Sequence, residues 1–263
     1  MKRAQAHQAA PSRDASNGPI RCRLSRCNRR CGSVVRVNTP TLCAHVGFEV
    51  IDGVAVLELR RPEKRNAVTW EMLEAILVHL ESAARRADIR VLVIRGSGGA
   101  FSAGADLARV KDADGTPSAS FEQLFIRALR AIADFPAPTV AGIEGACVGG
   151  GCALALACDV RLADTTAFFA IPAVRYGIVF EAGAITRMVE LMGSSRAARM
   201  LFTARRIDAL TAERAGLVDE CAEDVNELVS GFVRDVLLGD ADTIAATRAL
   251  VRSAASDAAG GAR

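Results

Sequence analysis

Two glycine-rich segments of this sequence could hold a negatively charged or polarised group. Residues 91–107 read VLVIRGSGGAFSAGADL, and residues 139–159 read TVAGIEGACVGGGCALALACD. Each starts with a short apolar run typical of a buried strand and continues through glycines into a helical pattern. Glycines such as Gly104 and Gly150 let a ligand approach the backbone, and a helix N-terminus presents unpaired N–H groups. Such donors predict an anion site, unless the glycines serve only close packing.

The anion is predicted to be a developing oxyanion rather than a bound phosphate. Neither segment contains G-x-x-x-x-G-K-[ST], and neither has G-x-G-x-x-G with an acid about 20 residues on. A nucleophile with a histidine partner is not favoured either, because His7 and His45 lie in the N-terminal segment and His79 lies on an amphipathic helix. Cys152, close to the second glycine run, therefore has no histidine to form a dyad.

The first 46 residues differ in composition from the rest. They hold nine Lys or Arg and one acid, Asp14, for a net charge of +8, and lack apolar periodicity. We predict a disordered basic leader over residues 1–46, with an organellar transit peptide as the second interpretation. A metal site is the third, on Cys22, Cys27 and Cys31, but structural zinc needs four ligands, so no metal is predicted.

Composition excludes several classes of protein. The chain is 51% hydrophobic and 24% charged, which is enough to build a large core. Residues 47–263 carry a net charge of −5, so no basic stripe for nucleic acid is expected. The longest uncharged run in the middle of the chain, 145–158, is shorter than the ~20 apolar residues of a membrane span. The body cysteines are expected to be reduced, which favours a cytoplasmic protein, or an organellar one if the leader is a transit peptide.

Regular elements are expected to position the glycine-rich segments. Residues 48–51 and 54–59 flank Asp52-Gly53 and predict a hairpin, and Thr69 is suited to cap a helix. Strands are expected at 91–94 and 139–143, with a helix at 121–132, and the chain after Ala182 has an almost entirely helical pattern. This alternation predicts an α/β fold.

A family resemblance adds to these inferences. Segments RRPEKRNAVTWEML, GGAFSAGADL, GACVGGGCALALACD, FAIPAVRYGI and ARRIDALTAERAGLVDE together resemble the crotonase superfamily, the enoyl-CoA hydratase/isomerase family, over about residues 47–222. The resemblance implies a ββα spiral core domain over 47–193 and a helical C-terminal region over 194–263 that is shorter than usual. It also implies a homo-oligomer, a trimer or hexamer, which the short C-terminal region puts in question.

The same resemblance implies a substrate and a site. The substrate would be an acyl-CoA thioester, with coenzyme A part of the substrate and no separate cofactor. Its thioester oxygen would accept hydrogen bonds from the amides of Ala105 and Gly150, an oxyanion hole. The residues implied in coenzyme A binding are Lys64, Arg65, Ala67, Ala103 and Arg109, with Lys111 as a further basic candidate.

Departures from the family pattern affect the expected reaction. The positions of the two glutamates of enoyl-CoA hydratases hold Ala153 and Ala173, whose methyl groups cannot transfer protons. Glu181 matches an aspartate of related isomerases and hydrolases and is either the sole acid/base or a helix cap. We therefore expect double-bond isomerisation rather than hydration. The alternatives are a catalytically weak accessory protein, or a thioester hydrolase or hydratase with a non-standard acid/base.

Overall fold

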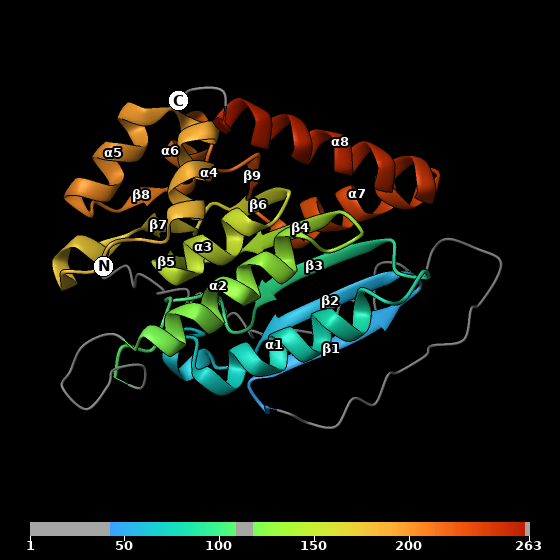
Figure 1. Ribbon diagram of the computed structural model, residues 1–263, viewed down its shortest axis with the longest axis horizontal. Helices are drawn as coiled ribbons and strands as arrows, with labels where there is room; N and C mark the ends of the chain where they lie inside the picture. The colour runs from blue at the N-terminus through green and yellow to red at the C-terminus, as the bar shows by residue number, and fades with distance from the viewer. Residues whose placement is uncertain (1–42, 109–117, 261–263) are drawn as a thin grey trace, which may run out of the picture. The chain divides into compact units, whose positions relative to one another are not determined.

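The computed structural model describes residues 43–108 and 118–260, the side chains of 256–260 excepted, and has the expected α/β architecture (Figure 1). Its strands are β1 (Val46–Ile51), β2 (Val54–Leu59), β3 (Val91–Gly96), β4 (Thr139–Ile143), β5 (Ala146–Val148), β6 (Val160–Asp164), β7 (Phe168–Ala170), β8 (Ile207–Asp208) and β9 (Glu220–Ala222). Its α-helices are α1 (Trp70–Ala83), α2 (Ala119–Ala133), α3 (Gly150–Ala157), α4 (Ala182–Met192), α5 (Ser194–Thr203), α6 (Ala209–Ala215), α7 (Val225–Leu238) and α8 (Ala241–Gly260). Short 3₁₀ turns, η3 (Pro62–Lys64) and η4 (Pro172–Tyr176), lie between them.

The described strands form a larger and a smaller sheet. The larger has the order β1-β2-β3-β4-β6-β9, with β1 and β2 antiparallel and the other pairs parallel. The smaller has the order β5-β7-β8. The predicted hairpin is confirmed, and Asp52 and Gly53 have φ of 50° and 81°, the signs that a type I′ turn requires.

The larger sheet is covered on both faces. Val91 and Val93 of β3 pack with Val225 and Val229 of α7, while Leu92, next along the strand, belongs to the main core with α1 and α2. Figure 1 shows α7 beside the strands of this sheet. Because both faces are buried, β3 is apolar at consecutive positions. Residues 91–94 therefore indicate a strand by a continuous apolar run and not by alternation of apolar and polar residues.

Several helices pack against one another in series. α1 packs on α2, α2 on α3, α3 on α4, and α4 contacts α8. Thr69 is confirmed as the N-cap of α1, where its hydroxyl accepts a hydrogen bond from the Met72 N–H. The strand at β4 and the helix at α2 are also confirmed within two residues.

The expectation of an almost entirely helical chain after Ala182 is wrong in two places. β8 pairs with β7 of the smaller sheet, and β9 pairs in parallel with β6, so the C-terminal region adds an edge strand to the larger sheet. Strands of two or three residues are too short to show the alternation that identifies a strand in sequence. The domain boundary at 193 remains a prediction.

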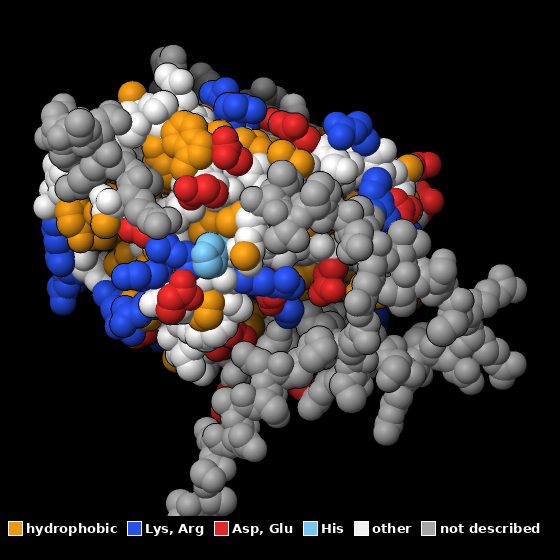
Figure 2. All heavy atoms as spheres, turned by 90° about the horizontal axis from the view of Figure 1, so that it is seen from below, with side chains coloured by type: hydrophobic (Ala, Val, Ile, Leu, Met, Phe, Trp, Pro, Cys, Tyr) orange, Lys and Arg blue, Asp and Glu red, His pale blue; other side chains and the backbone are white. Residues whose placement is uncertain are grey.

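Other predictions concern surfaces and termini. No described helix is both long and apolar enough to cross a membrane. The face in Figure 2 shows Lys and Arg side chains mixed with Asp and Glu side chains. Residues 1–42 of the predicted leader, together with Arg109 and Lys111, lie outside the described residues.

Candidate functional site

The two glycine-rich segments meet backbone to backbone. The Ser102 N–H donates to the Ala146 carbonyl at 2.8 Å, and the Val148 N–H donates to the Ser102 carbonyl at 2.9 Å. A Cβ added to Gly104 would lie 2.6 Å from the Val148 carbonyl oxygen and 2.9 Å from the Gly150 nitrogen. Gly104 also has φ of 89°, so both contact and conformation require glycine here.

Two N–H groups at this contact have no acceptor among the described residues. Gly150 is the first residue of α3, and a first-turn N–H has no partner within its own helix. Beside Ala105, the Gly104 carbonyl accepts from the Val68 N–H at 2.7 Å and the Asp106 N–H donates to the Val68 carbonyl at 2.9 Å, while the Ala105 N–H makes no such bond. A Cβ on Gly150 would lie 3.3 Å from the Ala105 nitrogen. The two donors therefore lie close to one another, and paired N–H groups of this kind are suited to an oxygen that gains negative charge.

Asn66 and Ser102, which sequence reasoning did not single out, hold the first turn in place. The Asn66 side-chain amide donates hydrogen bonds to the Ser97 and Ala100 carbonyls at 2.9 and 2.7 Å. The Asn66 backbone has φ of 55°. The Ser102 hydroxyl donates to the Asn66 carbonyl at 2.9 Å and accepts from the Gly104 N–H at 3.1 Å. Asparagine is one of the few residues that tolerate positive φ, which is the only signal for Asn66 in the sequence. Nothing in the sequence marks Ser102 as buried.

The segment implied in coenzyme A binding runs alongside the same turn. The Ala103 N–H donates to the Arg65 carbonyl at 2.8 Å, and the Ala67 N–H donates to the Lys64 carbonyl at 3.0 Å. Lys64 and Arg65 are exposed, and Ala67 and Ala103 are half-buried. The structure thus brings these four predicted residues to the edge that carries Ala105.

Glu181 occupies the N-cap of α4. Its two carboxylate oxygens accept hydrogen bonds from the Gly183 and Ala184 N–H groups at 2.8 and 2.6 Å. The helix-cap interpretation of Glu181 is therefore confirmed, while its catalytic role stays a prediction.

Glu181 also lines a cavity of about 550 Å³ together with Ala153. Ala173 lies half-buried in η4. Ala105 and Gly150 do not line this cavity, but Ala153 lies on α3 three residues after Gly150. The structure therefore brings Ala105 and Gly150 together, while Glu181 lines a cavity that neither of these two residues lines.

The acid at the exit of β4 lies elsewhere. Glu144 is half-buried, and burial, followed by the nearby charge of Asp164, raises the pKa of its carboxyl. Its carboxylate accepts a long hydrogen bond, 3.5 Å, from Asn226 at the start of α7, on the opposite face of the sheet from α1. These contacts fit a structural role for Glu144.

Several other polar side chains have structural partners or are buried. Asp106 pairs with Arg61 at 2.7 Å, and Arg187 pairs with Glu190 at 3.1 Å. Burial raises the pKa of the Cys158 thiol to about 12 and that of Cys147 well above its ordinary value. The described cysteines are free thiols, in agreement with the reduced body predicted from sequence. Within the described ranges, no cluster of three or more His, Cys, Asp or Glu has a metal-binding arrangement.

Comparisons with known proteins show which family this chain matches. The sequence pattern of the enoyl-CoA hydratase/isomerase family matches residues 49–254. A probable mitochondrial enoyl-CoA hydratase of Arabidopsis thaliana is 37% identical over 174 residues, which cover 64% of this chain and 56% of the relative. An enoyl-CoA isomerase/hydratase of Mycosarcoma maydis is 34% identical, covering 65% of this chain and 66% of the relative. The crystal structure of a putative enoyl-CoA hydratase/isomerase family protein from Hyphomonas neptunium has a TM-score of 0.76 and 30% identity, covering 81% of this chain and 83% of that one. The match thus spans less than two thirds of the plant relative's own length and about two thirds of the fungal one's.

Proposed function

This chain belongs to the enoyl-CoA hydratase/isomerase family of the crotonase superfamily, and from this we infer that its substrate is an acyl-CoA thioester. The observation that carries the proposal is the pair of N–H groups, on Ala105 and Gly150, that lie close together and have no acceptor among the described residues. A thioester carbonyl oxygen placed there accepts both hydrogen bonds. Coenzyme A is held as part of the substrate along residues 64–67 and Ala103.

The two donors stabilise the charge that develops during the reaction. Removing a proton next to a thioester leaves an enolate whose negative charge lies on the carbonyl oxygen. Donors already aimed at that oxygen need no reorganisation, and the loss of one donor typically costs ~10²–10³ in rate. The N-terminus of α3 adds its dipole at Gly150.

The proposed reaction is migration of a double bond. An isomerisation needs one group that takes a proton from one carbon and returns it to another, which a single carboxylate can do without a positioned water. We assign this role to Glu181. Each of its oxygens accepts one helix N–H, and a carboxylate offers about four acceptor sites, so capacity for a proton remains. The name of the Mycosarcoma maydis relative includes both isomerase and hydratase, so it is compatible with this reaction and does not select it.

A second candidate is a thioester-binding protein with little catalytic activity. The observation that favours it is the engagement of both Glu181 oxygens in capping α4. Ala153 and Ala173 provide no substitute, because a methyl group transfers no proton. Turnover of enoyl-CoAs separates the two candidates.

Binding of acyl-CoAs tests the common part of both proposals. We expect titration calorimetry with acyl- and enoyl-CoAs to show saturable binding that the Gly150→Pro variant loses, since proline removes the N–H. Proline suits the first position of a helix, so α3 should still form.

The matched control is Gly150→Ala. This variant keeps the N–H, although its Cβ would lie 3.0 Å from the edge of Phe125. Loss of binding in the proline variant alone supports the oxyanion hole. Absence of binding to the native protein overturns the proposed function.

The assembly and compartment are part of the proposal. We propose a homo-oligomer, a trimer or hexamer, acting in the cytoplasm, or in an organelle if residues 1–46 serve as a transit peptide. Light scattering of the full chain measures the assembly.

A further inference from the structure

A buried arginine lies beside the segment implied in coenzyme A binding. Arg61 is 7% exposed, and its Nη1 nitrogen donates to the Ala67 carbonyl at 3.0 Å and to the Asp106 carboxylate at 2.7 Å. Asp106 directly follows Ala105 in the sequence, so this ion pair lies next to one of the two proposed oxyanion donors. Hydrogen bonds from a charged donor are short and strong, so they hold the groups that accept them in one arrangement.

The Ala67 carbonyl and the Val68 N–H belong to the same peptide group. In a planar trans peptide group, the C=O and the N–H point in opposite directions. Because Arg61 holds the carbonyl, the Val68 N–H is directed the other way, where it donates to the Gly104 carbonyl at 2.7 Å. Val68 is fully buried, so water does not compete for this hydrogen bond.

The next peptide group repeats this arrangement. The Gly104 carbonyl, which accepts from Val68, shares its peptide group with the Ala105 N–H, so this N–H points away from Val68. It is one of the two N–H groups that have no acceptor among the described residues, and the Gly150 N–H lies close to it. A relay of hydrogen bonds thus runs from the Arg61 guanidinium through the peptide groups 67–68 and 104–105 to the Ala105 N–H.

Such a relay transmits polarisation as well as direction. Hydrogen bonds in series polarise one another, and they do so most in a buried setting of low dielectric constant. A positive group at the donor end therefore makes the last N–H a better donor, and an oxygen bound to the last N–H strengthens the bonds behind it. The Asp106 carboxylate offsets part of the arginine charge, so orientation is the larger effect of Arg61.

On the basis of the proposed function, we propose that Arg61 is a positioning residue for the thioester site. It orients the Ala105 N–H through the two peptide groups of the relay and not by contact with the thioester. The first carbonyl of the relay, that of Ala67, belongs to the segment 64–67 implied in coenzyme A binding. Binding of the coenzyme A part of the substrate is therefore linked to the alignment of an oxyanion donor.

Nuclear magnetic resonance of the native protein labelled with ¹⁵N-valine tests the relay without a substitution. Replacing bound coenzyme A by butyryl-CoA should move the Val68 amide proton downfield, because an acceptor at the Ala105 N–H strengthens the Val68 hydrogen bond. Val148 is the control, since its N–H donates to the Ser102 carbonyl at 2.9 Å in the same site but outside the relay. An unmoved Val68 proton, or equal shifts of the two valines, would overturn the proposal.

Arg61→Met tests the origin of the relay. By calorimetry, this variant should lower the affinity for butyryl-CoA relative to coenzyme A about two- to ten-fold, the fold-change that a hydrogen bond worth ~0.5–1.4 kcal/mol produces. Arg161→Met is the matched control. Arg161 is also buried and also pairs with an aspartate, Asp219, at 2.7 Å, but its hydrogen bonds go to residues outside the relay. This control should keep the native ratio of affinities.

The outcomes separate this proposal from the proposed function. If butyryl-CoA binds but Arg61→Met keeps the native ratio of affinities, or if both methionine variants lower it equally, the relay is wrong and the thioester site stands. If either variant does not fold, the valine shifts decide. If no acyl-CoA binds to the native protein, both proposals fail.

Discussion

Gly104 is the residue on which the approach of the two glycine-rich turns depends. Any side chain there would collide with the Val148 carbonyl and would displace the Gly150 nitrogen. The roles of the glycines and of the alanines at 153 and 173 could be predicted from the sequence. A glycine leaves the backbone open to a ligand, and the methyl group of an alanine cannot transfer a proton. The hydrogen bonds by which Asn66 and Ser102 hold the turn could not be predicted, since a buried hydrogen bond depends on residues far apart in the chain.

The role of Glu181 is tested by removing its charge. Glu181→Gln should lower isomerisation of 3-enoyl-CoAs by at least ~10²-fold, the usual contribution of an acid/base group. Asp208→Asn is the control, because Asp208 caps α6 in the same way by accepting from the Thr211 N–H. Both variants weaken a helix cap in the same way, so their losses of stability should be small and similar. Unchanged turnover in Glu181→Gln would eliminate this residue as the base.

Glu144 predicts a pH-dependent stability. Burial and the charge of Asp164 raise its pKa in the folded protein above the ordinary value of 4.5, so ionised Glu144 opposes folding. The cost is absent below that value and grows as the pH rises through the folded pKa. Glu144→Gln should therefore unfold at higher urea than the native protein at pH 7 and at the same urea near pH 4.

The exposed residue Glu74 on α1 supplies the control for this experiment. Glu74→Gln should show the same difference from the native protein at both pH values. A Glu144→Gln variant less stable than the native protein at pH 7 would contradict the argument.

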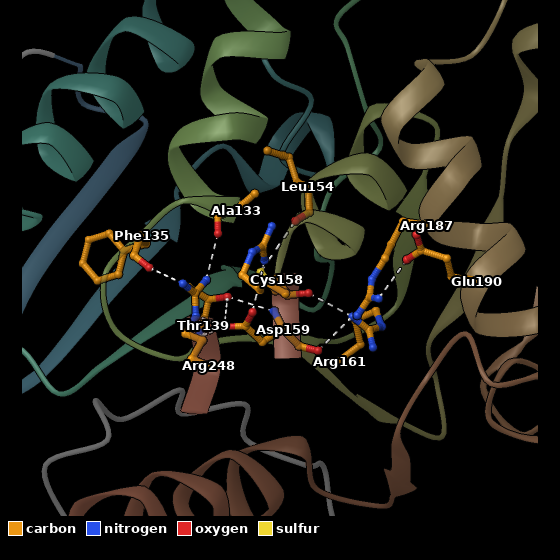
Figure 3. Close-up of polar contacts among 11 residues, drawn as sticks. Ala133, Phe135, Thr139, Leu154, Cys158, Asp159, Arg161, Arg187, Glu190 and Arg248 are labelled. Atoms are coloured by element: carbon orange, nitrogen blue, oxygen red, sulfur yellow. Dashed lines mark hydrogen bonds and ion pairs between the residues drawn. The ribbon is translucent and has the colours of Figure 1, made fainter. Parts of the chain in front are cut away.

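At the scale of elements, Arg248 is a main polar attachment of α8 to the core. Arg248 of α8 pairs with Asp159 at 2.6 Å and donates to the Phe135 carbonyl and, at 2.9 Å, to that of Ala133, at the end of α2 (Figure 3). These contacts hold α8 against Asp159 and the end of α2. The helical pattern of α8 could be read from the sequence, but its docking site could not, because the partners are about 90 to 115 residues away.

Arg248→Met should destabilise the protein by about 2 kcal/mol, because it leaves a partly buried carboxylate and two carbonyls with fewer donors. Arg252→Met is the comparison, since Arg252 pairs with the same Asp159 but its side chain is 36% exposed, and its loss should cost under ~1 kcal/mol. Urea unfolding followed by circular dichroism measures both. Equal effects of the two variants would show that Arg248 is not the main attachment.

At the scale of the whole molecule, the two parts of the chain differ in the sign of their net charge. The net charge of +3 combines +8 on residues 1–46 with −5 on the remainder. The α/β class followed from the order of strand and helix patterns. The edge strand β9 could not be predicted from this order, because its pairing with β6 depends on tertiary contact rather than on its own three residues.

This division predicts that the leader is dispensable. Limited digestion with trypsin should remove residues up to about 46 quickly, leave a resistant body and preserve acyl-CoA binding, since the proposed site lies within the body. Protection of Cys22, Cys27 and Cys31 from protease or from a thiol label would contradict the leader prediction.

The central claim is that the Ala105 and Gly150 amides bind a thioester oxygen, and infrared spectroscopy of a bound ¹³C-carbonyl butyryl-CoA tests it most directly. Hydrogen bonds to the oxygen lower the stretching frequency of the carbonyl. We predict a clear downward shift on binding to the native protein and to Gly150→Ala, and a smaller shift or no binding with Gly150→Pro. A carbonyl frequency in the native complex equal to that of free butyryl-CoA in water, or the same shift in all three proteins, would contradict the claim.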